Sequence, residues 1–222
     1  MTNRAVLFDI DGTLVDSNRY HIEAWHRVFA AIGRPVDRET IASQIGKGAD
    51  NLVPALFPDL SGREAEVERL GELHGTFFKS DYMPRVRPFP HARDLVERVH
   101  RSGQRVVLAS SASQAELDHY MDLLDIGSMV DLSTTKDDVE TTKPAPDIFA
   151  VAREKAGVDA ANVVVIGDAP YDMEAAVKCG MGRVGVRSGG FSDDVLTRAG
   201  AQTLYDDVAD LLARFDESPL GR

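Results

Sequence analysis

Short apolar runs alternate with segments of helical periodicity from residue 88 to the end of the chain. The runs are apolar almost throughout, which is typical of parallel strands that are buried on both faces of a sheet. The segments between them are long enough for helices that cross from one strand to the next. We therefore predict an α/β fold in which helices cover both faces of a parallel sheet. The strands are expected at residues 106–109, 129–132, 163–166, 183–186 and, more weakly, 203–205, with another far upstream at 5–8.

Residues that commonly begin or end helices occur between the predicted strands, where helices are expected. Ser113 and Glu116 have the spacing of a capping box, in which the side chain of one residue bonds to the backbone N–H of the other. Gly157 and Gly180 stand where glycines end helices, because glycine adopts the left-handed backbone conformation without steric cost. These signals predict a helix that begins at Ser113 and two helices that end at the glycines.

Between residues 16 and 87 the alternation is absent and helical spacing replaces it. Apolar residues recur there at three- and four-residue steps in two stretches, the second behind another capping-box pair, Ser61 and Glu64. We therefore predict a helical domain, residues 16–87, inserted into an α/β core domain of residues 1–15 and 88–222. The recurring residues are Ile22, Trp25, Phe29 and Ile32 in the first stretch and Val67, Leu70, Leu73 and Phe77 in the second.

Composition narrows the classes of partner. The 222 residues carry a formal net charge of -11, whereas surfaces that bind nucleic acid concentrate lysine and arginine. Cys179 is the only cysteine, so neither an intramolecular disulfide nor a cysteine-based zinc site is possible. No signal-type segment and no apolar stretch of membrane-spanning length occurs, and no coiled-coil pattern suggests a larger assembly. We expect a cytoplasmic monomer or dimer with no nucleic-acid or membrane partner.

Chemically active side chains follow four of the predicted strands. Ligands bind beyond the carboxyl ends of the strands in open parallel sheets, so these residues are expected at one edge. Two close carboxylates repel each other unless a cation or a proton intervenes, and the pair after the first strand is therefore a reason to look for a metal. The residues are Asp9 and Asp11 after the first strand, Ser110 and Ser111 after the second, Lys143 in the loop after the third, and Asp168 with Asp172 after the fourth.

This combination favours a phosphoryl group beside a metal ion. Hydroxyl residues at the start of a helix offer donors to a phosphate, and a lysine adds positive charge. Two unit charges about 4 Å apart repel by roughly 4 kcal/mol at an effective dielectric constant near 20, so one lysine cannot offset several carboxylates that face a phosphate dianion. Mg²⁺ prefers oxygen ligands and commonly contacts substrate phosphate as well. Mg²⁺ is therefore the expected cofactor, and a small phosphorylated metabolite is the expected partner.

The same residues resemble the four motifs of the haloacid dehalogenase superfamily. The motifs are the run from Asp9 to Thr13, the pair Ser110 and Ser111, Lys143 before Pro144, and Gly167-Asp168 followed by Asp172. All four occur in the order and spacing of that family, and the similarity covers essentially the whole chain. The resemblance implies a Rossmann-like core with an inserted α-helical cap domain, as in the phosphoglycolate phosphatase and β-phosphoglucomutase branch.

The resemblance also implies a role for each motif residue. Asp9 would attack phosphorus and form an aspartyl-phosphate, and Asp11 would protonate the leaving oxygen and then activate water. Ser110, or its neighbour Ser111, and Lys143 would hold the phosphoryl group. Mg²⁺ would be bound by Asp9, the backbone carbonyl of Asp11 and Asp168, with Asp172 supporting the metal or its waters. The implied enzyme is a Mg²⁺-dependent phosphatase of small phosphate monoesters, such as sugar phosphates or phosphoglycolate.

Two other functions stay open at this point. The first is a sugar-phosphate mutase of the β-phosphoglucomutase type, although residues 45–50 lack the arginine of the mutases' Lys-Gly-x-Ser-Arg pattern. The second is a phosphometabolite-binding module without catalysis. In the helical domain, His21 and Lys47 are candidate substrate contacts. His21 precedes Trp25 by one helical turn, and Lys47 stands between two glycines in an expected loop.

Overall fold

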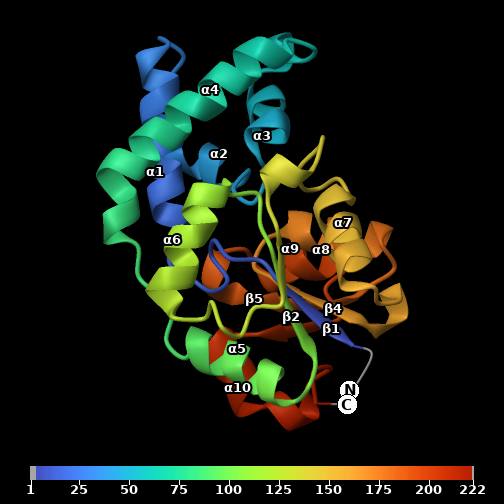
Figure 1. The fold of residues 1–222 in the computed structure, drawn as a ribbon. Helices are drawn as coiled ribbons and strands as arrows, with labels where there is room; N and C mark the ends of the chain where they lie inside the picture. The colour runs from blue at the N-terminus through green and yellow to red at the C-terminus, as the bar shows by residue number, and fades with distance from the viewer. Residues whose placement is uncertain (1–3, 222) are drawn as a thin grey trace.

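A computed structural model describes residues 4–221 and contains, within that range, one six-stranded sheet. The strand order is β3-β2-β1-β4-β5-β6 and every pairing is parallel, so the N-terminal strand lies inside the sheet (Figure 1). The predicted α/β fold with a parallel sheet is confirmed. The strands are β1 (Ala5–Phe8), β2 (Arg105–Ala109), β3 (Leu132–Thr134), β4 (Val163–Gly167), β5 (Gly182–Val186) and β6 (Thr203–Tyr205).

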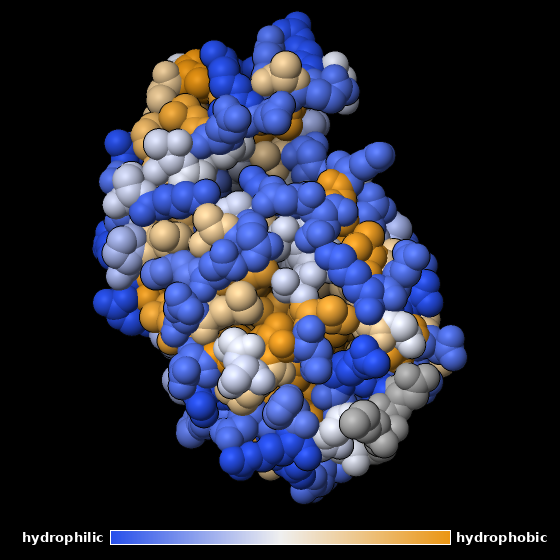
Figure 2. All heavy atoms as spheres, in the orientation of Figure 1, coloured by the Kyte–Doolittle hydropathy of each residue, from blue (hydrophilic) through white to orange (hydrophobic). Residues whose placement is uncertain are grey.

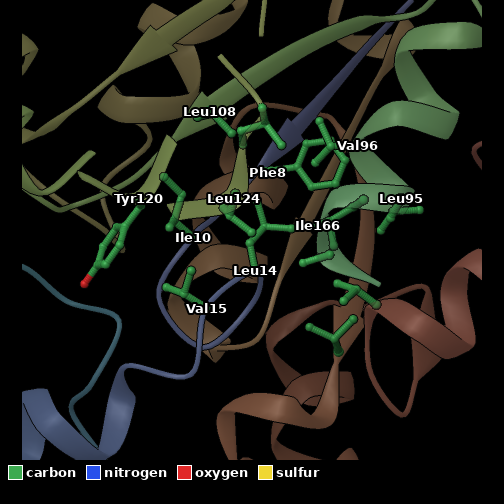
Figure 3. Close-up of a cluster of buried hydrophobic side chains, with 14 of the residues drawn as sticks. Phe8, Ile10, Leu14, Val15, Leu95, Val96, Leu108, Tyr120, Leu124 and Ile166 are labelled. Carbon is green, nitrogen blue, oxygen red and sulfur yellow. The ribbon is translucent and has the colours of Figure 1, made fainter. Parts of the chain in front are cut away.

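Helices cover both faces of the sheet, because successive residues of a strand point to opposite sides. Val6 and Phe8 pack into one cluster together with side chains of α5 (Ala92–Arg101), α6 (Gln114–Leu124) and α10 (Val208–Ala213). Figure 3 shows Phe8 of β1 in this cluster near Val96 of α5. Ala5 and Leu7 pack on the opposite face with α7 (Asp147–Ala156) and α8 (Pro170–Lys178), and α9 (Asp193–Ala199) contacts α8.

The segment between β1 and α5 forms a helical insertion with its own apolar core. Trp25, Phe29, Leu52 and Leu70 belong to this core, which confirms the two helices predicted from their spacing. The helical insertion comprises α1 (Asn18–Ala31), α2 (Arg38–Ala42), α3 (Ala49–Leu56), α4 (Glu64–Phe77) and the short turns η1 (Pro58–Leu60), η2 (Phe78–Tyr82) and η3 (Met83–Arg85). Figure 1 places it above the edge of the sheet where the strands end.

The two connections between the helical insertion and the core run side by side. Asp16 donates its N–H to the carbonyl of Arg87 at 2.9 Å, and Phe89 donates to Leu14, also at 2.9 Å. Val15 forms an antiparallel bridge with Pro88. The chain thus leaves the core and returns to it at one point. The predicted boundaries at residues 16 and 87 lie within this pair of connections.

Two local predictions are wrong. The third strand was expected at residues 129–132, but β3 begins only at Leu132, because Met129 donates its N–H to the carbonyl of Ile126 in a turn and buries its side chain there. Ser61 and Glu64 form no capping box. α4 begins at Glu64 with Arg63 before it, and Ser61 instead closes η1 by donating to Pro58.

The other helix-end signals are confirmed. Glu116 accepts hydrogen bonds from the N–H and the hydroxyl of Ser113, both at 2.7 Å, at the start of α6. Gly157 and Gly180 have positive φ angles at the ends of α7 and α8. Short 3₁₀ turns complete the structure: η4 (Lys136–Asp138), η5 (Ala160–Asn162), η6 (Arg187–Gly189) and η7 (Phe215–Glu217).

The face drawn in Figure 2 is covered largely by hydrophilic side chains. Within the described residues, we find no helix with the length and apolar character needed to cross a membrane.

Candidate active site

A cavity of about 970 Å³ lies between the helical insertion and the carboxyl ends of the strands. From the core it is lined by Asp9, Asp11 and Ser110, and from the helical insertion by His21 and Trp25 among others. Side chains predicted from widely separated motifs therefore meet at one edge of the sheet, as the rule for parallel sheets requires. A cavity of this size accommodates a small organic ligand with room to spare.

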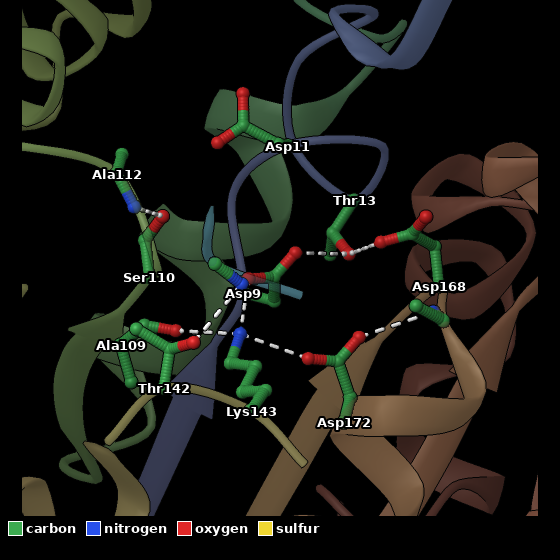
Figure 4. Close-up of polar contacts among 12 residues, drawn as sticks. Asp9, Asp11, Thr13, Ala109, Ser110, Ala112, Thr142, Lys143, Asp168 and Asp172 are labelled. Atoms are coloured by element: carbon green, nitrogen blue, oxygen red, sulfur yellow. Dashed lines mark hydrogen bonds and ion pairs between the residues drawn. The ribbon is translucent and has the colours of Figure 1, made fainter. Parts of the chain in front are cut away.

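Asp9 follows β1 directly and lies almost completely buried at the floor of the cavity. A tight turn positions it: Gly12 has a φ of +79°, and Thr13 and Leu14 donate their N–H groups back to the carbonyl of Ile10. Its Oδ1 accepts from Lys143 Nζ at 2.5 Å, and its Oδ2 lies 3.4 Å from the Thr13 hydroxyl (Figure 4). Burial raises the pKa of Asp9 to about 7, against the opposing charge of Lys143.

Asp9, Asp168 and Asp172 form a cluster of buried carboxylates, with one oxygen of each within 4.8 Å of the others. Asp168 accepts from the Thr13 hydroxyl at 3.0 Å and from Asn18 Nδ2 at 2.9 Å. Burial, followed by the charges of Asp9 and Asp172, raises the pKa of Asp168 well above its usual value. Buried carboxylates this close strongly favour a proton or a cation between them.

Lys143 is buried between two of these carboxylates. Its Nζ lies 2.5 Å from Asp9 Oδ1 and 2.8 Å from Asp172 Oδ1, and it donates to the carbonyl of Ala109 at 3.1 Å. Although burial would lower the pKa of Lys143, the charges of Asp172 and Asp9 raise it above its usual value, so the ammonium stays charged. Two of the three carboxylates therefore share one ammonium, Asp168 has none among the described residues, and the hard oxygen donors that remain fit a divalent cation.

Asp11 lies apart from this cluster and turns toward the helical insertion (Figure 4). Its Oδ1 accepts from the Ser17 hydroxyl at 2.6 Å and is 3.1 Å from His21 Nε2. Burial would raise the pKa of Asp11, but the charge of His21 and the hydrogen bonds from His21 and Ser17 lower it below its usual value. The two aspartates of the first motif thus sit in opposite electrostatic environments.

Ser110 and Ser111 lie at the end of β2 and line the cavity. The Ser110 hydroxyl accepts from the N–H of Ala112 at 3.0 Å. The Ser111 hydroxyl is buried and has no hydrogen-bond partner among residues 4–221. Hydroxyl and N–H groups at the start of a helix suit an anion.

The two candidate residues of the helical insertion have different surroundings. His21 lies in the cavity wall between Asp11 and His74, whose Nε2 is 3.3 Å from His21 Nδ1, and its ring stacks on Phe78. Lys47 also lines the cavity, but its Nζ donates to Gln44 at 2.6 Å and lies over the ring of Tyr171.

Several residues that support the site were not singled out from the sequence. Thr13 and Asn18 hold Asp168, His74 lies against His21, and Asp50 bonds to Thr142 beside Lys143. Thr13 is the last residue of the first motif and Thr142 adjoins Lys143, so their positions in the sequence are a signal that could have identified them. Asn18, Asp50 and His74 stand in the helical insertion, where periodicity alone does not separate polar residues that face the core from those that face solvent.

Comparison with known proteins finds a family match that spans all four motifs. The model of the family described as haloacid dehalogenase-like hydrolase matches residues 6–186. A phosphoglycolate phosphatase of Salmonella typhi is 26% identical over 230 residues, which cover 94% of this chain and 91% of the relative. Arabidopsis thaliana Protein SUPPRESSOR OF QUENCHING 1, chloroplastic, is 29% identical over 215 residues, which cover 93% of this chain and 20% of that protein.

A solved structure has a similar fold over nearly the whole chain. The crystal structure of a hydrolase from Pseudomonas syringae superposes with a TM-score of 0.87 at 32% sequence identity and covers 96% of this chain and 98% of that chain. The similarity therefore extends over both the sheet and the helical insertion. It confirms the resemblance predicted from the four motifs.

Proposed function

The chain belongs to the haloacid dehalogenase-like hydrolase family, and from this we propose that it is a Mg²⁺-dependent phosphatase of small phosphorylated metabolites that acts through an aspartyl-phosphate on Asp9. The observation that carries the proposal is the placement of Asp9. Its carboxylate is buried at the floor of a cavity, next to a buried ammonium and two further carboxylates. A phosphatase using a carboxylate nucleophile needs these groups together.

Asp9 acts as the nucleophile, and Asp11 acts first as general acid and then as general base. Asp9 attacks phosphorus, and the new O–P bond forms as the bond to the leaving oxygen breaks, while Asp11 gives its proton to that oxygen. Asp11 then takes a proton from water as the water oxygen attacks phosphorus, which releases phosphate and restores Asp9. Ser17 and His21 hold Asp11 in place for both transfers. Lys143, Ser110 and Ser111 bind the oxygens of the phosphoryl group.

Asp9, Asp168 and the backbone carbonyl of Asp11 would hold Mg²⁺, and Asp172 would support it. The fit rests on the donor set, which is a buried group of carboxylates with less positive charge than negative. When bound, Mg²⁺ supplies positive charge that lets a phosphate dianion approach Asp9. Asp168 is pre-positioned for this role by Thr13 and Asn18.

The helical insertion, within residues 16–87, acts in this proposal as a cap over the cavity. It excludes water from Asp9 and contacts the leaving group, and His21 and Lys47 are the substrate-facing residues we assign to it. The relative from Salmonella typhi is named a phosphoglycolate phosphatase. Phosphoglycolate and sugar phosphates are therefore the first substrates to examine.

One observation favours a phosphatase over a mutase. The mutases that this chain resembles carry a Lys-Gly-x-Ser-Arg pattern in the cap loop, and the comparable residues 45–50 here keep Lys47 but have no arginine. Asp50 and Asn51 occupy that loop and bond to Thr142 of the core. A carboxylate at this place disfavours a second phosphate.

The test is release of inorganic phosphate from a panel of phosphoglycolate, hexose phosphates and other phosphate monoesters, with and without Mg²⁺. We expect turnover that depends on Mg²⁺ and is lost in Asp9→Asn, with Asp59→Asn, an exposed acid of the helical insertion, as the matched control. Turnover that persists in both Asp9→Asn and chelator-treated protein would overturn the proposal. Faster interconversion of hexose phosphates than hydrolysis would instead identify a mutase, and tight binding without turnover would identify a binding module.

A further inference from the structure

A loop of the helical insertion docks on the core directly beside Lys143. We call residues 46–51, which comprise the end of the connection from α2 and the first turn of α3, the docking loop. Asp50 Oδ2 accepts from the N–H of Thr142 at 2.8 Å, and Asp50 Oδ1 accepts from the Thr142 hydroxyl. One carboxylate of the helical insertion therefore binds two donors of one core residue.

The docking loop also satisfies the acceptors of Thr142. Gly48 donates its N–H to the Thr142 hydroxyl at 3.0 Å, and Asn51 Nδ2 donates to the Thr142 carbonyl, also at 3.0 Å. Every polar group of Thr142 is thus bonded to the helical insertion, and the residue is buried. A single surface hydrogen bond would constrain Thr142 only weakly, whereas four hydrogen bonds to this one residue fix its position.

The docking loop lies unusually close to core side chains at two glycines. A Cβ on Gly48 would lie 2.4 Å from the Thr142 hydroxyl oxygen, and one on Gly46 would lie 2.6 Å from the Cβ of Ala169. Ala169 stands between Asp168 and Asp172, so the docking loop lies against two of the three core loops that carry charged site residues, the one with Lys143 and the one with Asp168. Gly46 also has a φ of +103°, a conformation that disfavours other residues.

Thr142 immediately precedes Lys143, whose ammonium lies between Asp9 and Asp172. A shift of Thr142 would move the start of the lysine side chain, and the contacts of its ammonium at 2.5 and 2.8 Å would weaken as their distances and angles depart from good geometry. We propose that Asp50 is a positioning residue: by holding Thr142 it couples docking of the helical insertion to placement of Lys143 against Asp9. The proposal rests on the proposed function, because it assigns the consequence of docking to phosphoryl transfer.

Asp50 also borders the cavity, so a direct contact with substrate is the competing explanation. Its two oxygens are already engaged by Thr142, and one of them also accepts from Asn51 Nδ2 at 2.9 Å. The geometry points to the core loop as the partner of this carboxylate. Substrates with different leaving groups distinguish the two explanations.

The first experiment compares Asp50→Ala with Asp59→Ala, using p-nitrophenyl phosphate and acetyl phosphate as probes in the presence of Mg²⁺. Asp59 is the matched control, because it also lies in the helical insertion and accepts two hydrogen bonds, both of them from Arg34 of the same insertion. We expect Asp50→Ala to lower kcat roughly ten- to a hundredfold, by the same factor for both probes, with little change in KM. Asp59→Ala should retain wild-type rates.

Asp50→Asn keeps one carbonyl oxygen for the Thr142 N–H and should recover part of the rate. Thr142→Val removes the hydroxyl and should lower kcat as well, and the double variant Asp50→Ala/Thr142→Val should lose little more than Asp50→Ala alone, because both act through one contact. Equal rates for Asp50→Ala and Asp59→Ala would overturn the proposal. A loss confined to one leaving group, or carried by KM, would overturn it in favour of a substrate contact.

A second measurement does not depend on turnover. The N–H of Ala145 donates to the Thr142 carbonyl at 3.0 Å within the core, so its hydrogen exchange reports whether the turn around Lys143 is held. We expect faster exchange of both the Thr142 and the Ala145 amides in Asp50→Ala, and unchanged exchange in Asp59→Ala. If the wild-type protein shows no phosphatase activity but this pattern appears, the proposed function fails while the positional coupling stands. If only the Thr142 amide changes, the turn does not depend on docking and the coupling fails.

Discussion

The core side of the cavity and the helical insertion hold their functional side chains by different means. In the core, charged groups are fixed by polar partners from distant segments, as when Thr13 and Asn18 hold Asp168. In the helical insertion, aromatic rings stack on one another. The ring centroids of His21 and Phe78 are 3.9 Å apart, and those of His74 and Trp25 are 4.3 Å apart. Buried charges need their exact partners, whereas stacked rings mainly need shape. Substitutions in the core should therefore cost more than those in the helical insertion.

Lys143→Met should give the largest effect, because it leaves Asp9 and Asp172 buried without their shared ammonium. Removing one partner of a buried ion pair typically costs about 3–5 kcal/mol, and we expect the free energy of unfolding to fall by that order. Phosphate release should fall roughly a hundred- to a thousandfold. Denaturant unfolding and steady-state kinetics measure the two effects.

Lys155→Met is the control, since the pair between Lys155 and Asp138 is partly exposed. Exposed pairs contribute roughly 0–1 kcal/mol, so this variant should stay close to wild type. If Lys143→Met is as stable as Lys155→Met, the contrast between the two regions is wrong.

The carboxylate cluster should make stability depend on pH and Mg²⁺. Burial raises the pKa of Asp9 to about 7 and the pKa of Asp168 well above its usual value, so the folded state binds protons more tightly than the unfolded chain. Stability then falls as the pH rises through the folded-state pKa values. We expect the Tm of metal-free protein to decrease between about pH 5 and about pH 8, and Mg²⁺ to restore it most at the upper end.

Asp168→Asn serves as the matched variant for that measurement, because it removes one of the carboxylates whose pKa is raised. Its Tm should depend less on pH and respond less to Mg²⁺. A metal-free wild-type Tm that rises steadily over the same range would contradict the assignment of these protons.

His21→Asn tests a residue of the helical insertion that contacts Asp11, the proposed proton-transfer residue. The charge and hydrogen bond of His21 lower the pKa of Asp11 against the effect of burial, so their removal should raise that pKa. The limb of the pH–rate profile that reports Asp11 should move to higher pH, with kcat lowered roughly tenfold. Stability should change by less than in Lys143→Met. A profile that keeps its wild-type limbs would show that His21 does not act on Asp11.

Lys47→Ala should have the smallest effect. Its ammonium is held by Gln44 and lies over Tyr171, so its loss should alter KM by a few-fold and leave kcat unchanged. Measured KM values for phosphoglycolate and for a hexose phosphate provide the comparison. A large decrease in kcat would place Lys47 nearer to the reacting atoms than we assign it.

The sheet and the charged core residues were predictable because their signals are local. Asp9, Ser110 and Asp168 each follow an apolar strand directly, Lys143 follows β3 after a longer loop, and the carboxyl ends of parallel strands lie at one edge of the sheet. The run at 129–132 misled for the same reason, since an apolar turn and a buried strand look alike over four residues. Met129 is buried, as its apolar character suggests, but it lies in a turn.

Contacts between the helical insertion and the core could not be predicted in this way. Asp50 and Thr142 are more than ninety positions apart, and Asn18 lies 150 positions from Asp168. Asp50, Thr142 and Asn18 each read as an ordinary exposed position on a helix or loop, because periodicity identifies the apolar face and leaves the others equivalent. Their roles appear only when the two regions are seen together.

The paired connections at Val15 and Pro88 give the helical insertion the character of a replaceable module. Because its two ends are anchored side by side, a shorter or longer segment could join the same two points without changing the register of any strand. Exchange of residues 18–85 for another helical segment, or for a short turn, would keep the strands that carry the carboxylates and Lys143, but would remove the contacts of Asn18 and Asp50 with the core. Such chimaeras would separate the activity of the core residues alone from the contribution of the helical insertion. They would also show whether a different insertion changes the leaving group that the same core accepts.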